Sequence, residues 1–318
     1  MGDKVPSCSV LEPERALEEL KGMLKGFKGS WFLDKDGPFR ISLKKARGNL
    51  LFLRTRYQQM ELVQLEGYGL CMILDGKVQL AASDESIYHE LLVHPACVLH
   101  GSPSSVLILG GGDGCAAREL LRYETIREIV IVDIDEEVVS VFREQFRELH
   151  KGSLEDPRVR VVPQDAMEFL KSIGRSYDII ISDLTEPFDL AEKAGELSAH
   201  LYSSQAYALI SDRLTQGGIF VCQSGGILYQ PGYDQYHLEI LQGVRASFPH
   251  VEVAYEFVPS FEAMWSITLA SRRPLGISST DVDRTLARLG VEGLLHYDGR
   301  AHQRAFSPPR LLGGVASK

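Results

Sequence analysis

The sequence contains no closely spaced pair of cysteines. Its cysteines are scattered singly along the chain, at Cys8, Cys71, Cys97, Cys115 and Cys222. A disulfide scaffold or a structural zinc site would need cysteines at regular, paired spacings. We therefore expect reduced thiols, a cytoplasmic protein and no metal site.

Long apolar runs and an excess of basic residues are also absent. No stretch approaches the ~20 apolar residues of a membrane span, and the first residues have no apolar core like that of a signal peptide. The 34 basic and 43 acidic residues give a net charge of −9, which argues against a nucleic-acid partner. With 44% hydrophobic and 24% charged residues in 318, the composition is that of a globular protein of about two domains.

The first part of the chain predicts a helix followed by short strands. Apolar residues recur at helical spacing over 11–28, and β-type runs follow up to residue 83. Two of these runs flank Asp75-Gly76, a strong signal for a two-residue hairpin turn. We expect residues 1–83 to form an N-terminal helix and a small antiparallel β domain.

Strands and helices alternate in the rest of the chain, residues 84–318. A helix is expected over 84–100, with Pro95 ending or kinking it. Further helices are expected over 115–124, 136–149, 166–173 and 203–214, and strands over 105–110, 128–133, 159–162, 177–182, 218–223, 251–258 and 264–271. Continuous apolar strands that alternate with helices predict a parallel sheet covered on both faces, so the fold class is α/β.

The first of these parallel strands runs into a glycine-rich turn, Gly110-Gly111-Gly112-Asp113-Gly114. Such a turn lets the backbone approach a ligand, and the helix after it presents free N–H groups. Asp133 ends the next strand, where an acid can bind a ribose diol. Asp113 would repel a pyrophosphate and attract a cation, which favours a sulfonium nucleoside such as S-adenosylmethionine over a dinucleotide.

Acids also follow the next two strands. Asp165, beside the small Ala166, could accept a hydrogen bond from an adenine amino group. Asp183 and Glu186 could flank a cationic group and raise each other's pKa into the range of a general base. Each of these acids could instead only cap a helix or face solvent in a loop, and both interpretations stay open at this point.

Taken in order, the motifs resemble those of the polyamine aminopropyltransferases, the spermidine and spermine synthase family. They are Tyr57-Gln58, Leu74–Gln79, Asp84–Glu90, Gly110–Gly114, Asp133–Asp135, Asp165-Ala166 and Asp183–Pro187. The resemblance implies a Rossmann-like, methyltransferase-type sheet domain preceded by the small antiparallel β domain. It also implies transfer of the aminopropyl group of decarboxylated S-adenosylmethionine to an amine, with release of methylthioadenosine and without a cofactor or a metal.

The resemblance implies a role for each candidate residue. Asp183 would be the base that deprotonates the amine, with Tyr88 beside it, whereas Asp135 would only cap a helix. The nucleoside donor would be held by Gln58, His89, Gly111, Asp113, Asp133, Asp165 and Ala166. The amine would be met by Gln79, Asp84, Tyr88, Asp183, Glu186 and Glu262.

Departures from the spermidine synthase pattern bear on the amine. Glu186 stands where spermidine synthases usually have Asp, and 258–265 resembles a segment of thermospermine and spermine synthases. The tail 294–309 is similar to the extra C-terminal segment of the thermospermine type. We therefore expect spermidine as the acceptor, with agmatine or putrescine as the alternative. Phe261, Trp265 and Tyr229 are the expected walls for its methylene and ammonium groups.

Other functions stay open beside the transferase. A methyltransferase that uses ordinary S-adenosylmethionine is disfavoured by the 84–90 motif, and a non-catalytic nucleoside-binding relative by Asp183. Asp113 disfavours a nucleotide-binding oxidoreductase. The expected partner is a small polyamine, with no nucleic acid and no membrane, and the family suggests a homodimer or homotetramer.

Overall fold

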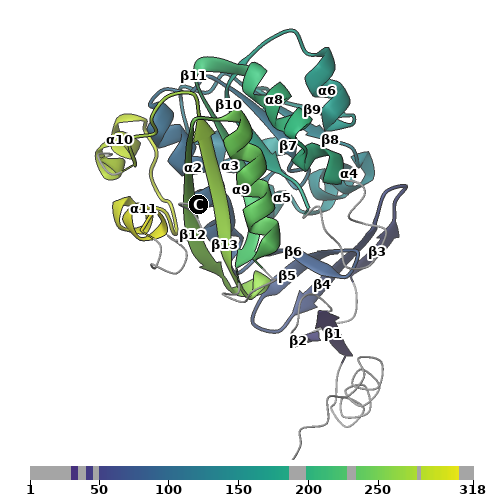
Figure 1. Cartoon of the computed structure of the whole chain (residues 1–318). Helices are drawn as coiled ribbons and strands as arrows, with labels where there is room; N and C mark the ends of the chain where they lie inside the picture. Colours follow the sequence, from purple (N-terminus) through teal and green to yellow (C-terminus); the bar gives the residue numbers. More distant parts are fainter. Residues whose placement is uncertain are drawn as a thin grey trace, which may run out of the picture.

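Two β-sheets lie in different parts of the molecule (Figure 1). The computed structural model describes residues 30–34, 41–45, 50–185, 198–227, 234–277 and 281–307. The helix expected over 11–28 lies outside these residues. Within the described ranges, no helix combines the length and apolar character that crossing a membrane requires.

Sheet A, the smaller of the two, is antiparallel throughout. Its strands are β1 (Ser30–Asp34), β2 (Ile41–Lys45), β3 (Leu51–Arg54), β4 (Gln59–Leu65), β5 (Gly69–Leu74) and β6 (Lys77–Ala81). They follow the order β1-β2-β4-β5-β6, with β3 also paired to β4. This confirms the small antiparallel β unit; a domain boundary at residue 83 stays a prediction.

The turn between β5 and β6 is the predicted two-residue hairpin. Asp75 and Gly76 both have positive φ, of 47° and 88°, as a type I′ turn requires. Leu74 pairs with Lys77 across it. The Asp75 carboxylate also accepts the N–H of Gln59 at 2.8 Å, which holds the turn against β4.

Helix α2 (Glu85–His100) connects the two sheets, and it continues through Pro95. The expectation that Pro95 could end this helix is therefore wrong. Residues 88–98 of α2 are all buried, so packing on every side compensates for the hydrogen bond that proline cannot donate. The helix ends instead at Gly101, in the left-handed conformation with φ 86°.

Sheet B confirms the α/β fold class. Its strands are β7 (Ser105–Gly110), β8 (Glu128–Asp133), β9 (Val159–Pro163), β10 (Tyr177–Asp183), β11 (Leu214–Ile227), β12 (His250–Val258) and β13 (Ala263–Ser271). Their order is β12-β13-β11-β10-β7-β8-β9. The five strands from β11 to β9 are parallel, and β13 and β12 are added antiparallel at one edge.

Helices cover both faces of sheet B (Figure 1). Besides α2 they are α3 (Cys115–Leu120), α4 (Glu136–Gln145), α5 (Arg147–His150), α6 (Ala166–Ser172), α8 (Ser204–Asp212), α9 (Gln235–Ser247), α10 (Val282–Arg288) and α11 (Gly299–Ala305). Val106 and Ile108 of β7 belong to one apolar core, with α2, α3 and α4. Leu107 and Leu109 belong to another, with α6, α8 and α9. The side chains alternate between faces because β7 is extended. The helix expected over 136–149 is divided at Phe146.

The C-terminal part of the chain is anchored to α2 by a buried carboxylate. Glu90 accepts backbone N–H groups of Leu295, His296 and Tyr297, at 2.7–2.8 Å. Glu90 is 1% exposed, so these N–H groups replace the water that the carboxylate loses on burial.

Candidate active site

A cavity opens between sheet A and the carboxyl ends of the parallel strands of sheet B. Gly110, Asp133 and Asp183 are the last residues of β7, β8 and β10, which are neighbours in the sheet. Sheet A contributes the apolar residues Met72 and Leu74. The cavity holds about 1050 Å³ of empty space, solvent at its mouth included. This is the edge at which open α/β sheets bind their ligands.

Most of the predicted site residues line this one cavity. They are Gln58, Gln79, Tyr88, His89, Gly111, Asp113, Asp133, Asp165, Ala166 and Asp183. They come from both sheets and from α2, so the fold brings together residues that lie more than a hundred positions apart. Phe261 and Trp265 of the expected acceptor walls also line it.

The glycine-rich turn 110–114 places its backbone in close contact with Asp133 and Asp183. Gly110 has φ 80°, and a Cβ there would lie 2.1 Å from the carbonyl oxygen of Asp183. Gly111 donates its N–H to that carbonyl at 3.1 Å. A Cβ on Gly112 would lie 2.6 Å from Oδ2 of Asp133. Only glycine leaves room for this close approach.

Asp133 is held by backbone on both of its oxygens. Oδ2 accepts the N–H of Gly112 at 3.0 Å and Oδ1 that of Asp135 at 2.9 Å. Burial raises the pKa of Asp133 to about 6, and the nearby charges of Asp135 and Asp113 add to this effect, although the two N–H groups oppose it. Each carboxylate oxygen has a second lone pair for a ligand hydroxyl.

Asp183 is a partly buried residue whose two carboxylate oxygens differ in their partners. Its Oδ1 accepts the hydroxyl of Tyr88 at 2.7 Å. Its Oδ2 is buried and has no hydrogen-bond partner among the described residues. Burial, and then the charge of Asp113, raise the pKa of Asp183 to about 6, against the opposing effects of His89 and Tyr88. A carboxylate with this pKa can accept a proton near neutral pH.

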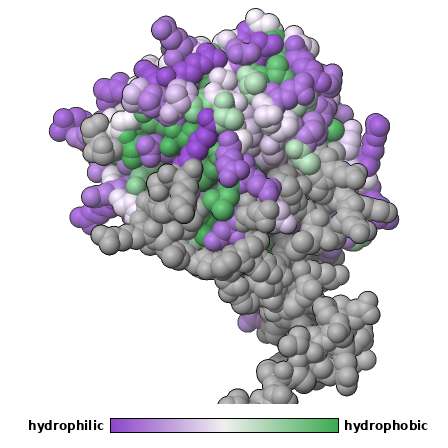
Figure 2. Space-filling model, viewed as in Figure 1, coloured by the Kyte–Doolittle hydropathy of each residue, from purple (hydrophilic) through white to green (hydrophobic). Residues whose placement is uncertain are grey.

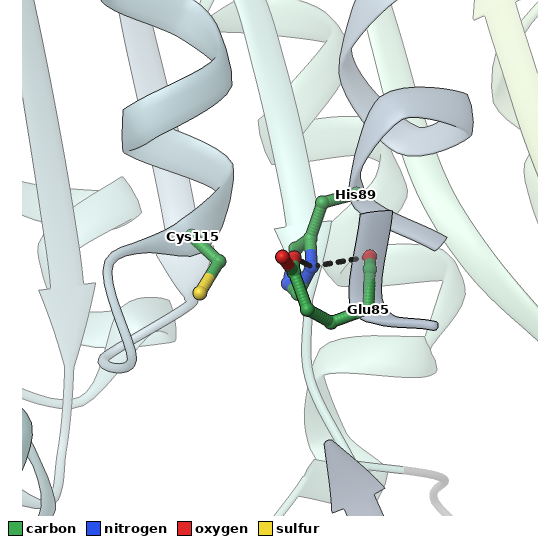
Figure 3. A group of neighbouring side chains, drawn as sticks. All are labelled: Glu85, His89 and Cys115. Atoms are coloured by element: carbon green, nitrogen blue, oxygen red, sulfur yellow. Dashed lines mark hydrogen bonds and ion pairs between the residues drawn. The ribbon is translucent and has the colours of Figure 1, made fainter. Parts of the chain in front are cut away.

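The ring of His89 contacts Glu85, which lies one turn earlier in α2 (Figure 3). Its Nδ1 lies 2.9 Å from a carboxylate oxygen of Glu85, and its Nε2 lies 3.9 Å from Oδ1 of Asp113. Burial lowers the pKa of His89, but Glu85, Asp113 and Asp183 together raise it to about 9.

Glu85, His89 and Cys115 are close enough to hold a metal ion by geometry alone. However, Arg118 donates to both oxygens of Glu85, at 3.0 and 2.7 Å. Burial also raises the pKa of the Cys115 thiol well above its ordinary value. A metal bound there would have to displace a guanidinium and deprotonate the thiol, so these donors do not fit one well.

Two predicted ligands also have structural partners. Asp165 caps α6 by accepting the N–H of Glu168 at 3.0 Å, and its other oxygen lies 2.9 Å from Nε2 of His200. Asp113 accepts the N–H of Cys115 at 2.7 Å. Asp165 therefore does cap a helix, which was the alternative interpretation. Both Asp165 and Asp113 nevertheless line the cavity.

Two predicted amine-binding carboxylates, Asp84 and Glu262, are not among the residues that line the cavity. Asp84 is buried, and its oxygens accept the N–H and the hydroxyl of Ser260, at 2.7 and 2.9 Å. Glu262 follows the short 3₁₀ helix η3 (Pro259–Phe261) in the left-handed conformation, outside the cavity lining. Glu186, like Tyr229, lies outside the described residues.

Asp135 caps α4, as predicted, and it also joins the two sheets. It accepts the N–H of Val138 at 3.4 Å. Its other oxygen accepts the hydroxyl of Thr55 at 2.7 Å and the side-chain amide of Gln58 at 3.0 Å. The position of Gln58 at the cavity therefore depends on this buried contact.

Glu85 and Gln223 are two residues at the site to which the sequence pattern had assigned no role. Gln223 of β11 lines the cavity and donates to the carbonyl of Leu184 at 2.8 Å and to the hydroxyl of Tyr202 at 2.9 Å. Glu85 precedes His89 by one helical turn. That i, i+4 spacing on a predicted helix could have identified Glu85, whereas no local signal marks Gln223.

Known proteins share both this sequence and this fold. Residues 85–279 match the family model described as spermine/spermidine synthase domain. A polyamine aminopropyltransferase of Aeropyrum pernix is 42% identical over 77% of this chain and 76% of its own length. One of Saccharolobus solfataricus is 34% identical over 89% and 92%.

Solved structures agree with the sequence relatives. A spermidine synthase in complex with the transition state analogue AdoDATO superposes with a TM-score of 0.82 at 25% identity, covering 94% of this chain and 99% of that one. The spermidine synthase of Thermotoga maritima gives 0.81 at 25% identity, over 95% and 99%. The chain therefore belongs to the spermine/spermidine synthase family and is an aminopropyltransferase.

Proposed function

We propose that the enzyme moves the aminopropyl group of decarboxylated S-adenosylmethionine to a polyamine. The observation that carries this proposal is the buried Oδ2 of Asp183, which has no hydrogen-bond partner within the described ranges and lies in a cavity lined by further acids. An anionic cavity suits a sulfonium nucleoside and an amine, which are both cations. A structural neighbour, a spermidine synthase in complex with the transition state analogue AdoDATO, supports a transferase site in this fold.

Asp183 would act as the general base. An alkylamine has a pKa of about 10.4 and is protonated at neutral pH, so its nitrogen has no lone pair for attack. Transfer of one proton to Oδ2 of Asp183 would free that lone pair. Tyr88, which donates to Oδ1 at 2.7 Å, would keep the carboxylate turned toward the amine.

The reaction needs no further chemical group. The amine nitrogen forms a bond to the aminopropyl carbon while the bond from that carbon to sulfur breaks, and methylthioadenosine leaves as a neutral thioether. The sulfonium already makes a good leaving group, so the protein supplies alignment and proton removal. We therefore propose that the nucleoside is a co-substrate and that no resident cofactor or metal takes part.

The cavity lining suggests how the nucleoside donor lies. Asp133 would bind the ribose hydroxyls, and Asp165 with Ala166 would meet the adenine further along the same edge. Gln58, His89 and Asp113 would hold the aminopropyl arm, with Gly111 allowing its close approach to Asp183. The carboxylate of Asp113 would repel the carboxylate of ordinary S-adenosylmethionine and so favour the decarboxylated donor.

Spermidine is the proposed acceptor, which would make the product thermospermine or spermine. The ring centroids of Phe261 and Trp265 lie 4.8 Å apart, and the ring centroids of Phe261 and Tyr88 lie 5.6 Å apart. They form an apolar wall beside Asp183 that suits the methylene segments of a long amine. Gln79 also faces this cavity, and Glu186 and Glu262 stay candidates for a more distant ammonium group. Agmatine and putrescine are the alternative acceptors.

The decisive experiment is an incubation with each nucleoside and a panel of amines. Decarboxylated S-adenosylmethionine should give methylthioadenosine, and spermidine should be used faster than putrescine or agmatine, with the product isomers separated by chromatography. S-adenosylhomocysteine from ordinary S-adenosylmethionine would indicate a methyltransferase instead. No turnover with any amine would favour a nucleoside-binding relative without activity.

The assembly and the location of the enzyme stay predictions. We expect a homodimer or homotetramer, measurable by light scattering, and a cytoplasmic enzyme, measurable by cell fractionation.

A further inference from the structure

Glu85 connects His89 to a buried cation. Its two carboxylate oxygens accept from Nη1 and Nη2 of Arg118, at 3.0 and 2.7 Å. One of them also lies 2.9 Å from Nδ1 of His89, and Figure 3 shows this contact. All three side chains are largely buried, with exposed fractions of 3% for His89, 11% for Glu85 and 7% for Arg118.

This contact determines which ring nitrogen of His89 faces the site. Nδ1 lies within hydrogen-bond distance of the carboxylate of Glu85 and of its backbone carbonyl, at 2.9 and 2.8 Å. Both of these oxygens can only accept, so Nδ1 carries a proton. Nε2 is therefore the nitrogen free to interact with the acids, and it lies 3.9 Å from Oδ1 of Asp113. One ring nitrogen of His89, one oxygen of Asp113 and one of Asp183 lie within 4.8 Å of one another.

The groups packed around His89 are mostly acidic. Glu85 comes from its own helix, Asp113 from the glycine turn and Asp183 from β10. Tyr88 donates its hydroxyl to Asp183. Cys115 is a neutral thiol, because burial raises its pKa well above the ordinary value. Arg118 is the positive group, and Glu85 lies between it and His89. These acids raise the pKa of His89 to about 9 against the opposing effect of burial, so His89 is an imidazolium in the free enzyme at neutral pH.

We propose that Glu85 is a positioning residue for the transfer: it holds His89 as a cation between Asp113 and Asp183, and the positive aminopropyl arm of the nucleoside donor replaces that cation. An ammonium group beside Nε2 and a proton on Nε2 are both hydrogen-bond donors with like charge, so they exclude one another. The Nε2 proton therefore leaves to solvent when the arm binds. Neutral Nε2 then accepts a hydrogen bond from the ammonium, while Glu85 keeps Nδ1–H in place.

The charge balance of this step is simple and measurable. The positively charged aminopropyl arm enters the site and the Nε2 proton of His89 leaves it. Asp113 and Asp183 therefore have one positive charge beside them both before and after the donor binds. Donor binding at a pH below about 9 should thus release a proton, and the dissociation constant should fall by up to about tenfold per pH unit between pH 7 and 9. The proposal rests on the proposed nucleoside donor.

Titration calorimetry tests this in two buffers of different ionisation enthalpy, at pH 7.5. Decarboxylated S-adenosylmethionine should release close to one proton per site, since Asp183 is already ionised there. Methylthioadenosine, which has no positive arm, should bind with almost no release. Binding of the decarboxylated nucleoside without proton release would overturn the role of His89 and leave the proposed donor intact. Failure of that nucleoside to bind would overturn the donor assignment and this proposal together.

Matched variants separate positioning from packing. Glu85→Gln keeps an acceptor for Nδ1–H but removes the charge, so proton release at pH 7.5 and the pH slope of binding should both decrease. Glu119→Gln is the control, because Glu119 also binds Arg118, at 2.7 Å, but touches His94 rather than His89. Equal release in wild type and Glu85→Gln would contradict the proposal.

A further variant keeps the test valid if Glu85→Gln does not fold. His89→Gln replaces the ring with a neutral group, and it should bind the decarboxylated nucleoside without releasing a proton. Release of one proton by His89→Gln would place the proton on another group and overturn the proposal.

Discussion

At the scale of single residues, the site depends on carboxylates that are buried but not fully paired. Asp183 has one oxygen on Tyr88 and one without a partner in the described part of the chain. A buried charge is costly unless it is paired. Proteins keep such a group mainly where a ligand completes it, so this oxygen marks the point at which an ammonium would bind.

Replacing Asp183 by Asn should lower kcat by about 10²–10⁴-fold, because the amine then keeps its proton. Methylthioadenosine should still bind, as calorimetry can check. In the wild type, kcat/KM should fall as the pH falls through about 6, the pKa of Asp183 in the free enzyme. A near-normal rate for Asp183→Asn would remove it as the base.

Replacing Gly112 by Ala should strongly weaken binding of the nucleoside. The new Cβ would lie 2.6 Å from Oδ2 of Asp133 and 2.9 Å from Val139, so the carboxylate has to move off the ribose position. Gly174→Ala is the control, because a Cβ there meets nothing within 4 Å. Equal nucleoside affinity in the two variants would argue against a ribose site at Asp133.

At the scale of elements, η3 and the start of α2 form one unit. The two hydrogen bonds from Ser260 to Asp84 hold η3 in place, and η3 carries Phe261 against Tyr88. Asp84 thus contributes to the acceptor wall through Ser260. The sequence pattern could place Asp84 near the site, but its partner lies 176 residues away, and no local signal pairs the two.

Replacing Ser260 by Ala should raise the KM for the amine several-fold and leave nucleoside binding nearly unchanged. It removes one hydrogen bond to a charged group, of about 1.5–3 kcal/mol, and lets Phe261 move from Tyr88. Ser140→Ala, which removes an exposed hydroxyl from α4, should change neither constant. A change in nucleoside KM alone would show that the contact serves another purpose.

At the scale of the whole molecule, much of the fold could be predicted from local patterns. Apolar runs located the parallel strands to within a few residues, and Asp75-Gly76 located the hairpin. The edge that lines the cavity was also predictable, because the carboxyl ends of parallel strands meet at one edge. The unbroken course of α2 through Pro95 was not, because it depends on burial by elements distant in sequence.

The contact between the two sheets could not be predicted either. Asp135 was interpreted as a helix cap, and its bonds to Thr55 and Gln58 span 80 and 77 residues. Only the folded chain shows that Asp135, which follows β8, also bonds residues beside sheet A.

Replacing Thr55 by Val should lower the free energy of unfolding by about 1–3 kcal/mol and raise the KM for the nucleoside. The Thr55 hydroxyl donates to Asp135 and accepts the N–H groups of Tyr57 and Gln58. Thr125→Val is a matched control, because its hydroxyl has no partner among the described residues. Denaturant unfolding and steady-state kinetics measure both effects, and equal behaviour of the two variants would contradict this role.

The carboxylate of Glu90 links residues 295–297 to the helix that carries Tyr88 and His89. Glu90 directly follows Tyr88 and His89, and it grips the backbone of residues 295–297. A chain shortened before residue 295 would leave the buried carboxylate of Glu90 without these N–H partners, and Glu90 lies directly beside His89 in the sequence. Loss of activity after such trimming would then follow from a displaced α2, the helix that carries Tyr88 and its hydrogen bond to Asp183.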